Sequence, residues 1–210
     1  MNPFFRNTLA SSVAKGLVLS GLALTASITA LAEKVTVTVK GTVSAGGDMY
    51  GIFGVGKDIG GKPFTLTFTF DDARAHKGDA PCADAASVFN GSNPSSPAAA
   101  VLTIGHGSFT FGNLPNSTWS AHRDVDSTCG PDALFLSLNE GTYPQVEGFQ
   151  FKLISVPGKP WATKSIDWHS PLHATDFDSG QNSQSFIIVH PGDFTRLTQG
   201  VLVVESVTVQ

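Results

Sequence analysis

The sequence predicts an all-β fold, an antiparallel two-sheet β-sandwich of the jelly-roll kind, with a β-barrel as the alternative. Two observations support this prediction. Apolar and polar residues alternate with a period of two in segment after segment, and glycine, proline, asparagine and aspartate separate these segments. No segment after residue 32 sustains the 3.6-residue period of a helix, and only a short helical turn is expected, near 81–89.

The predicted strands follow one another along the chain, about eight to ten in all. The first, VTVTVKGTV, alternates valine with threonine, and the second, FTLTFTF, sets its phenylalanines on one face and its threonines on the other. The segment VLTIGHGSFTF reads as a hairpin, because a Gly-His-Gly turn separates two apolar runs. The predicted strand regions are 35–43, 64–70, 101–111, 134–138, 149–154, 186–189 and 201–209.

The N-terminal 32 residues have the features of a secretory signal peptide. Arg6 and Lys15 precede or flank an apolar run at 16–28, no acidic residue is present, and Ala-Leu-Ala at 30–32 suits a signal peptidase. The sequence therefore predicts cleavage after Ala32, a single β domain over 33–210, and a secreted protein, either extracellular or periplasmic. An uncleaved membrane anchor is the alternative, although the run is short for a bilayer span.

The overall charge excludes two classes of partner. The chain has a formal net charge of −4 at pH 7, and no stripe of basic residues runs along it. Nucleic acids and anionic membrane surfaces both need clustered lysine or arginine, so neither is expected as a partner. No second apolar stretch approaches a membrane span, so no stable membrane insertion is expected after signal cleavage.

The two cysteines, Cys82 and Cys129, are an even pair in a chain that is expected to be exported. Such a pair predicts one disulfide bond. The alternative is a reactive or metal-bound thiol pair, which the lack of a C-x-x-C motif disfavours.

The stretch GIFGVGKD at 51–58 has the G-x-x-x-x-G-K spacing of a phosphate-binding loop. However, Asp58 stands where that loop needs serine or threonine, and a carboxylate there would repel phosphate. The residues that follow, IGGKPF, cannot begin the helix that such a loop requires. The stretch is therefore predicted to be a glycine-rich connection between strands.

Two segments resemble an uncharacterised family of secreted bacterial β-rich proteins. In the first segment, 41–73, the pattern is a G-T-V strand, then D-x-x-G-x-F-G, then G-x-x-F, and then an alternating strand that ends in F-D. The stretch 95–113 resembles the second segment of the family, whose pattern is A-x-L-T-I-x-G-x-x-F. Many such proteins are exosortase-sorted (PEP-CTERM), but the last residues here, VLVVESVTVQ, contain no Pro-Glu-Pro motif. The resemblance implies a secreted β-rich domain and no particular activity. The matching residues are Asp48, Gly51, Phe53, Gly54, Gly61, Phe64, Phe70 and Asp71.

Two acidic stretches are candidate calcium loops, and no other cofactor is indicated. DVDSTCGPD contains Asp124, Asp126 and Asp132, and DFDSGQN contains Asp176 and Asp178. Alternating oxygen ligands around a turn suit a hard cation, although neither stretch has the complete twelve-residue pattern. The alternative is that each is a polar turn in which aspartate accepts hydrogen bonds from nearby N–H groups.

Three tryptophans, Trp119, Trp161 and Trp168, lie in predicted loops and could stack on sugar rings. The alternative is that they close the ends of the core, as large aromatic residues usually do. The sequence contains neither G-x-S-x-G nor H-E-x-x-H, so it carries no recognisable catalytic motif. We therefore expect an exported, non-enzymatic structural or binding domain. The alternative is an extracellular carbohydrate-binding or carbohydrate-active protein, and the partners to expect are polysaccharides or matrix proteins.

Overall fold

The computed structural model describes residues 34–71, 89–92, 98–112, 117–124, 131–142, 145–161, 168–178, 183–189 and 196–210. The chain divides into two units, Met1–Ala30 and Leu31–Gln210, and all described residues belong to the second. The described strands are β1 (Lys34–Asp48), β2 (Pro63–Asp71), β3 (Phe89–Ser92), β4 (Ala98–Ile104), β5 (Gly107–Phe111), β6 (Thr118–Asp124), β7 (Ala133–Thr142), β8 (Gln145–Ile154), β9 (Leu172–Ala174), β10 (Ser183–Val189) and β11 (Leu197–Val209). No helix occurs in these ranges, and hence none that could cross a membrane.

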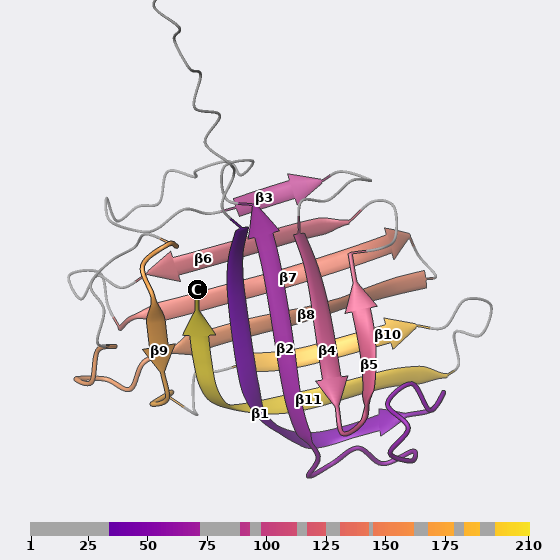
Figure 1. Ribbon diagram of the computed structural model, residues 1–210. Helices are drawn as coiled ribbons and strands as arrows, with labels where there is room; N and C mark the ends of the chain where they lie inside the picture. Colours follow the sequence, from indigo (N-terminus) through magenta and orange to yellow (C-terminus); the bar gives the residue numbers. More distant parts are fainter. Residues whose placement is uncertain are drawn as a thin grey trace, which may run out of the picture. The chain divides into compact units, whose positions relative to one another are not determined.

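All strand pairs are antiparallel, which confirms the predicted all-β antiparallel fold. Hydrogen bonds join the strands in the order β3-β6-β7-β8-β10-β11-β1-β2-β4-β5, and β9 pairs with β11. Strands β1, β2, β4 and β5 cross in front of β6, β7, β8 and β10, and the long strand β11 bends from one group toward the other (Figure 1). The register of β1 on β11 shifts at Lys40/Gly41 and at Val43/Ala45, and such bulges let a strand bend.

The core lies between the two parts of the curled sheet. Phe68 of β2 packs edge-on against Phe149 of β8, with ring centroids 5.6 Å apart, and against Trp119 of β6 at 6.4 Å. Because β2 is not hydrogen-bonded to either strand, the sheet must curl back on itself to bring these rings together. One face of every long strand is thereby removed from water. The predicted division into two separate sheets stays a prediction.

Asp48 organises the glycine-rich stretch that follows β1. Its buried carboxylate accepts hydrogen bonds from the backbone N–H groups of Ile52 (2.9 Å) and Phe53 (2.7 Å) and from the hydroxyl of Thr198 (3.0 Å). Glycines with positive φ at Gly51, Gly54 and Gly56 turn the chain around this carboxylate. The N–H groups of Ile52 and Phe53, which a phosphate-binding loop would direct at a phosphate, thus donate to the Asp48 carboxylate instead.

The two segments that carry the family resemblance touch each other. A Cβ atom at Gly107, the first residue of β5, would lie 2.3 Å from the Cα of Phe53. Only glycine permits this close approach of two backbones. Phe53 is itself fully buried and packs edge-on against Phe186 of β10 at 5.9 Å. Phe53 and Gly107 therefore have a structural role: they hold the glycine-rich connection against the start of β5.

The structure differs from the sequence prediction at three strands, β3, β6 and β9. Trp119 was expected in a loop but lies in β6, and β9 occupies a stretch without a predicted strand. In β6 the inward positions are Trp119, Ala121 and Arg123, and a buried arginine breaks the apolar alternation that identifies a strand. The helical turn expected near 81–89 lies outside the described residues, except that Phe89 begins β3.

Candidate binding surface

The three tryptophans do not form a surface for sugar stacking. Trp119 and Trp168 are 1% exposed and Trp161 is 6% exposed, so no indole face is open to a ligand. Trp119 lies 5.5 Å from the ring of Phe70, and Trp168 packs edge-on against the same ring at 5.1 Å. The stacking prediction is therefore wrong for all three residues, and the alternative, that they close the core, describes them correctly.

Asp132, one of the candidate calcium ligands, is buried and bonds to segments distant in the sequence. Its Oδ2 accepts a hydrogen bond from the backbone N–H of Trp161, and its carbonyl accepts one from the N–H of Ser155 at 2.8 Å. These long-range contacts differ from a local polar turn, and the turn stays a prediction. The side chain of Asp124 and all of Asp126 lie outside the described structure.

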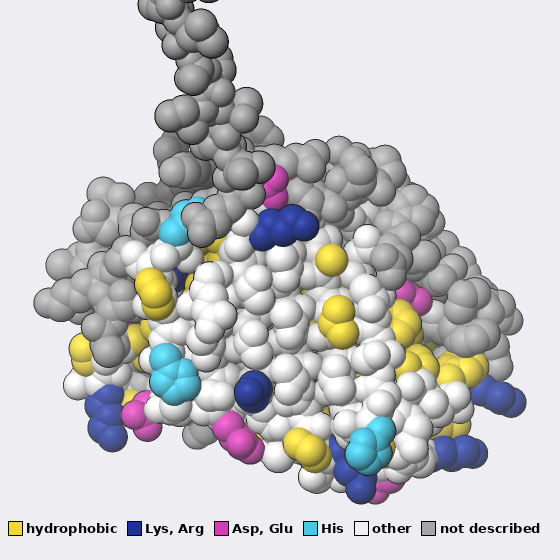
Figure 2. Space-filling model, viewed as in Figure 1, with side chains coloured by type: hydrophobic (Ala, Val, Ile, Leu, Met, Phe, Trp, Pro, Cys, Tyr) yellow, Lys and Arg dark blue, Asp and Glu magenta, His cyan; other side chains and the backbone are white. Residues whose placement is uncertain are grey.

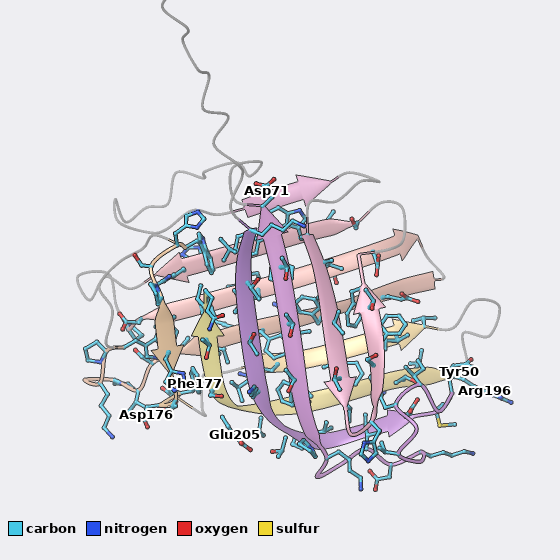
Figure 3. The ribbon with its side chains drawn as sticks, in the orientation of Figure 1. Tyr50, Asp71, Asp176, Phe177, Arg196 and Glu205 are labelled. Carbon is cyan, nitrogen blue, oxygen red and sulfur yellow. The ribbon has the colours of Figure 1, made fainter. Side chains whose placement is uncertain are left out.

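The second candidate loop lies beside Asp132, because Ser155, which donates to the Asp132 carbonyl, also forms a β-bridge with Phe177. Asp176 is exposed in the segment after β9, next to Phe177 and far from Asp71 at the end of β2 (Figure 3). Asp178 is half-buried, and its backbone N–H donates to the carbonyl of Ile154 at 2.8 Å. No three histidine, cysteine or acidic residues gather as metal ligands within the described ranges. Calcium binding thus stays a prediction, as does the disulfide, because Cys82 and Cys129 are not among the described residues.

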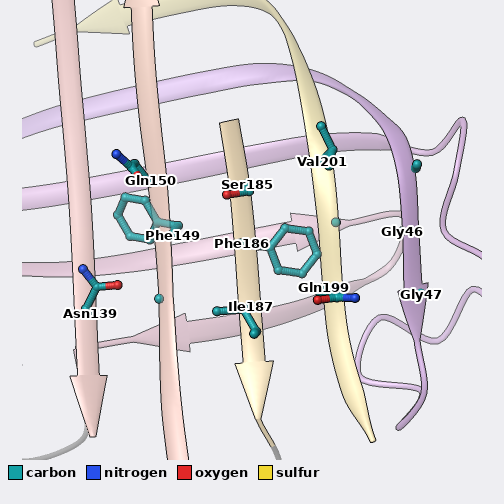
Figure 4. A pocket seen from close by; sticks show the side chains of 13 residues that line it. Gly46, Gly47, Asn139, Phe149, Gln150, Ser185, Phe186, Ile187, Gln199 and Val201 are labelled. Carbon is teal, nitrogen blue, oxygen red and sulfur yellow. The ribbon is translucent and has the colours of Figure 1, made fainter. Parts of the chain in front are cut away.

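A hollow of about 670 Å³ lies across strands β1, β7, β8, β10 and β11. Two rows of side chains form its floor (Figure 4). In one row Gln150 pairs with Ser185, and Ser185 pairs with Val201. In the next row Ile187 stands between Gly148 and Gln199, and Asn139 pairs with Gly148. Sequence reasoning missed this site because its residues come from five strands and carry no motif.

Glycines give the hollow its depth. Gly46 and Gly47 line it from β1, Gly148 from β8 and Gly200 from β11. Gly47 pairs with the outward residue Gln199, and Gly148 pairs with Ile187, so the absent side chains leave space on the side of the hollow. At Gly148 a Cβ atom would also lie 2.5 Å from the Leu138 carbonyl oxygen. Gly46 and Gly200 pair with each other on the core side, where a Cβ atom at Gly200 would lie 2.7 Å from the buried Phe186 ring. The floor of the hollow is therefore bare backbone at Gly47 and Gly148.

The hollow is uncharged among its described residues. The outward side chains are amides from Asn139, Gln150 and Gln199, the hydroxyl of Ser185, and the aliphatic groups of Ile187 and Val201. Amides both donate and accept hydrogen bonds, and Val201, at 53% exposure, offers an apolar contact. This combination suits a neutral ligand that has hydroxyl groups and C–H surfaces.

Two acidic residues that are adjacent in sequence to lining residues of the hollow lie on the other face of the sheet. Glu140 and Glu147 are directly paired between β7 and β8, and both are buried. Since strand residues alternate between faces, Glu140 points away from the face that carries Asn139. Its Oε1 accepts a hydrogen bond from the N–H of Gly112 at 2.7 Å, which ties the end of β5 to β7. Glu140 therefore joins β5 to β7, and neither Glu140 nor Glu147 lines the hollow.

Comparison with known proteins identifies no relative: no protein-family model, curated protein or solved structure matches this chain.

Proposed function

We propose that this chain is an exported, non-catalytic binding domain and that its hollow binds a neutral polysaccharide. The observation that carries the proposal is the uncharged lining, in which three amides and a hydroxyl surround two aliphatic side chains. Sugar rings present hydroxyl groups at their edges and C–H groups on their faces, so they match both kinds of lining group. The backbone-built shape of the hollow lowers the cost of ordering it around a ligand.

The same lining disfavours charged ligands and catalysis. A phosphate or uronate would need arginine or lysine, and neither occurs among the described lining residues. General acid–base chemistry on a glycosidic bond needs two carboxyl groups at the bond. The nearby pair, Glu140 and Glu147, is on the buried face of the sheet. We therefore favour binding over a carbohydrate-active enzyme.

Export is tested by expressing the full chain in a bacterium and fractionating the cells. We expect the protein in the periplasm or medium, with Glu33 as its N-terminal residue, because residues 1–32 have the features of a signal peptide. N-terminal sequencing and intact mass measure the cleavage. Changing Ala30 and Ala32 to bulky residues should abolish it. An intact Met1 terminus on cytoplasmic protein would refute export.

Ligand binding is tested by calorimetry with short oligosaccharides of a β-glucan, a galactomannan and amylose, each measured separately. We expect at least one to bind, and the double variant Gln150→Ala/Gln199→Ala to weaken that binding by about tenfold or more, since each lost hydrogen bond is worth about 1 kcal/mol. Lys152→Ala is the matched control, because Lys152 is exposed on β8 next to the hollow but outside its lining.

Three results would contradict this function. Binding of none of the neutral oligosaccharides would refute the ligand class. Binding that the double variant leaves unchanged would refute the hollow as the site. A preference for the anionic polymer alginate over all three would overturn the argument from charge.

A further inference from the structure

Strands β1, β2, β4, β5 and β11 present a second surface, rich in hydroxyl groups and poor in charge, which we name the hydroxyl face. Its defining residues alternate with buried core residues along the strands, so their side chains lie on the solvent side of the sheet. The described residues of the hydroxyl face that carry hydroxyl groups are Thr36, Thr38, Thr65, Thr67, Thr69, Thr103, Ser108, Thr110, Ser206 and Thr208.

The strand register sets these hydroxyl groups in rows across the sheet. In one row, Thr208 pairs with Thr38 and Thr38 with Thr67. In the next row, Thr65 pairs with Thr103 and Thr103 with Ser108. Rows and strands of a sheet have regular spacings of about 6.7 Å and 4.8 Å, so the hydroxyl groups form an ordered array.

This surface is unusual in its lack of charge. The solvated face of a sheet normally carries several lysine, glutamate or aspartate residues. In the rows described above, Lys40 is the one charged residue, between Ser206 and Thr65. Figure 2 shows this face largely free of acidic and basic side chains over its centre. A polyanion would find one basic side chain, Lys40, in these rows, and an uncharged polymer would have to desolvate only that one charge.

Threonine is also suited to binding without a large entropic cost. Its β-branched side chain is restricted at χ1, so its hydroxyl samples few positions. Each hydroxyl can donate and accept a hydrogen bond, and its methyl group supplies an apolar contact beside it. An array of such groups is preorganised for a hydroxyl-rich surface.

We infer that the hydroxyl face is a second binding site for neutral polysaccharide, independent of the hollow; the inference rests on the proposed function for the ligand class alone. The two sites face opposite ways, because Phe68 behind the hydroxyl face packs against Phe149 behind the hollow. One domain can then hold two polysaccharide chains and cross-link them. Such a domain would act as a non-covalent link in an extracellular matrix.

The test uses the triple variant Thr38→Val/Thr67→Val/Thr103→Val, which removes hydroxyl groups and keeps side-chain shape and strand propensity. Thr175→Val, at an exposed position after β9, is the matched control. Calorimetry with the three oligosaccharides should show two sites per protein for the wild type and the control, and one for the triple variant. Light scattering of the polymers mixed with protein should show cross-linked particles for the wild type and none for the triple variant. Unfolding curves verify that each variant is folded.

The outcomes separate this inference from the proposed function. If the triple variant keeps the wild-type stoichiometry and still cross-links the polymers, the hydroxyl face is not a site. If Gln150→Ala/Gln199→Ala removes all binding and the triple variant removes none, the hollow is the site and the inference is wrong. If the triple variant removes all binding and the hollow variant none, the hydroxyl face binds and the hollow does not. If no oligosaccharide binds, both are wrong.

Discussion

Replacing Asp48 by alanine is expected to lower the free energy of unfolding by roughly 3–6 kcal/mol. The variant leaves the N–H groups of Ile52 and Phe53 and the hydroxyl of Thr198 without their acceptor, inside the protein. Each buried polar group that loses its partner costs about 1–3 kcal/mol. Phe53 should then leave its packed position against Phe186. Denaturant unfolding of the purified protein measures the loss.

Two further variants show whether the effect belongs to this hydrogen-bond network. Asp58→Ala, at an exposed position of the same connection, removes a carboxylate whose one described hydrogen bond is to the exposed N–H of Gly60, and should change stability by less than about 1 kcal/mol. Thr198→Val should destabilise the wild type but add little to Asp48→Ala, since both remove the same contact. An Asp48→Ala variant as stable as Asp58→Ala would refute the role of Asp48.

Replacing Gly41 by alanine should destabilise the domain by about 3 kcal/mol or more. The new Cβ atom would lie 1.9 Å from the carbonyl oxygen of Val203 and 2.9 Å from its carbonyl carbon. Both are backbone atoms of β11, which cannot move aside as a side chain can. The variant must therefore separate β1 from β11 where their register shifts. Thermal and denaturant unfolding measure the change.

Gly47→Ala is the matched control, in the same strand. A Cβ atom at Gly47 would lie 3.7 Å from its nearest neighbour, the Lys57 carbonyl oxygen, which is an ordinary contact. Its stability should lie within about 1 kcal/mol of the wild type. Equal stabilities for the two variants would mean that β1 and β11 do not approach at Gly41 as described.

The hollow and the hydroxyl face share one chemical property, a high content of neutral hydrogen-bonding groups. Both the hollow and the hydroxyl face are built from neutral hydrogen-bonding groups, and charged residues make up 14% of the chain. Globular proteins average about 25% charged residues. This composition supports our proposal of neutral partners, and the two binding tests address each face separately.

Much of the strand content was determined by the sequence alone. The alternation of phenylalanine and threonine over 64–70 specifies both that β2 is a strand and which of its faces is buried, because strand side chains alternate with a period of two. The same pattern identified the strands at 35–43, 149–154 and 201–209. The glycines of 51–58 likewise specified a turning connection instead of a phosphate site.

Only the tertiary structure decided what the polar residues do. Asp48 was a motif residue without a role until the fold brought Thr198 to it, 150 positions away. Trp119 was expected in a loop; the fold places it in β6, where the neighbouring Arg123 is buried and donates to the carbonyl of Ser170 at 2.8 Å. The hollow and the hydroxyl face exist because register places Gln150 beside Ser185 and Thr38 beside Thr67. Local periodicity determines which face a residue occupies, but its neighbours on that face depend on long-range strand pairing, which no single segment encodes.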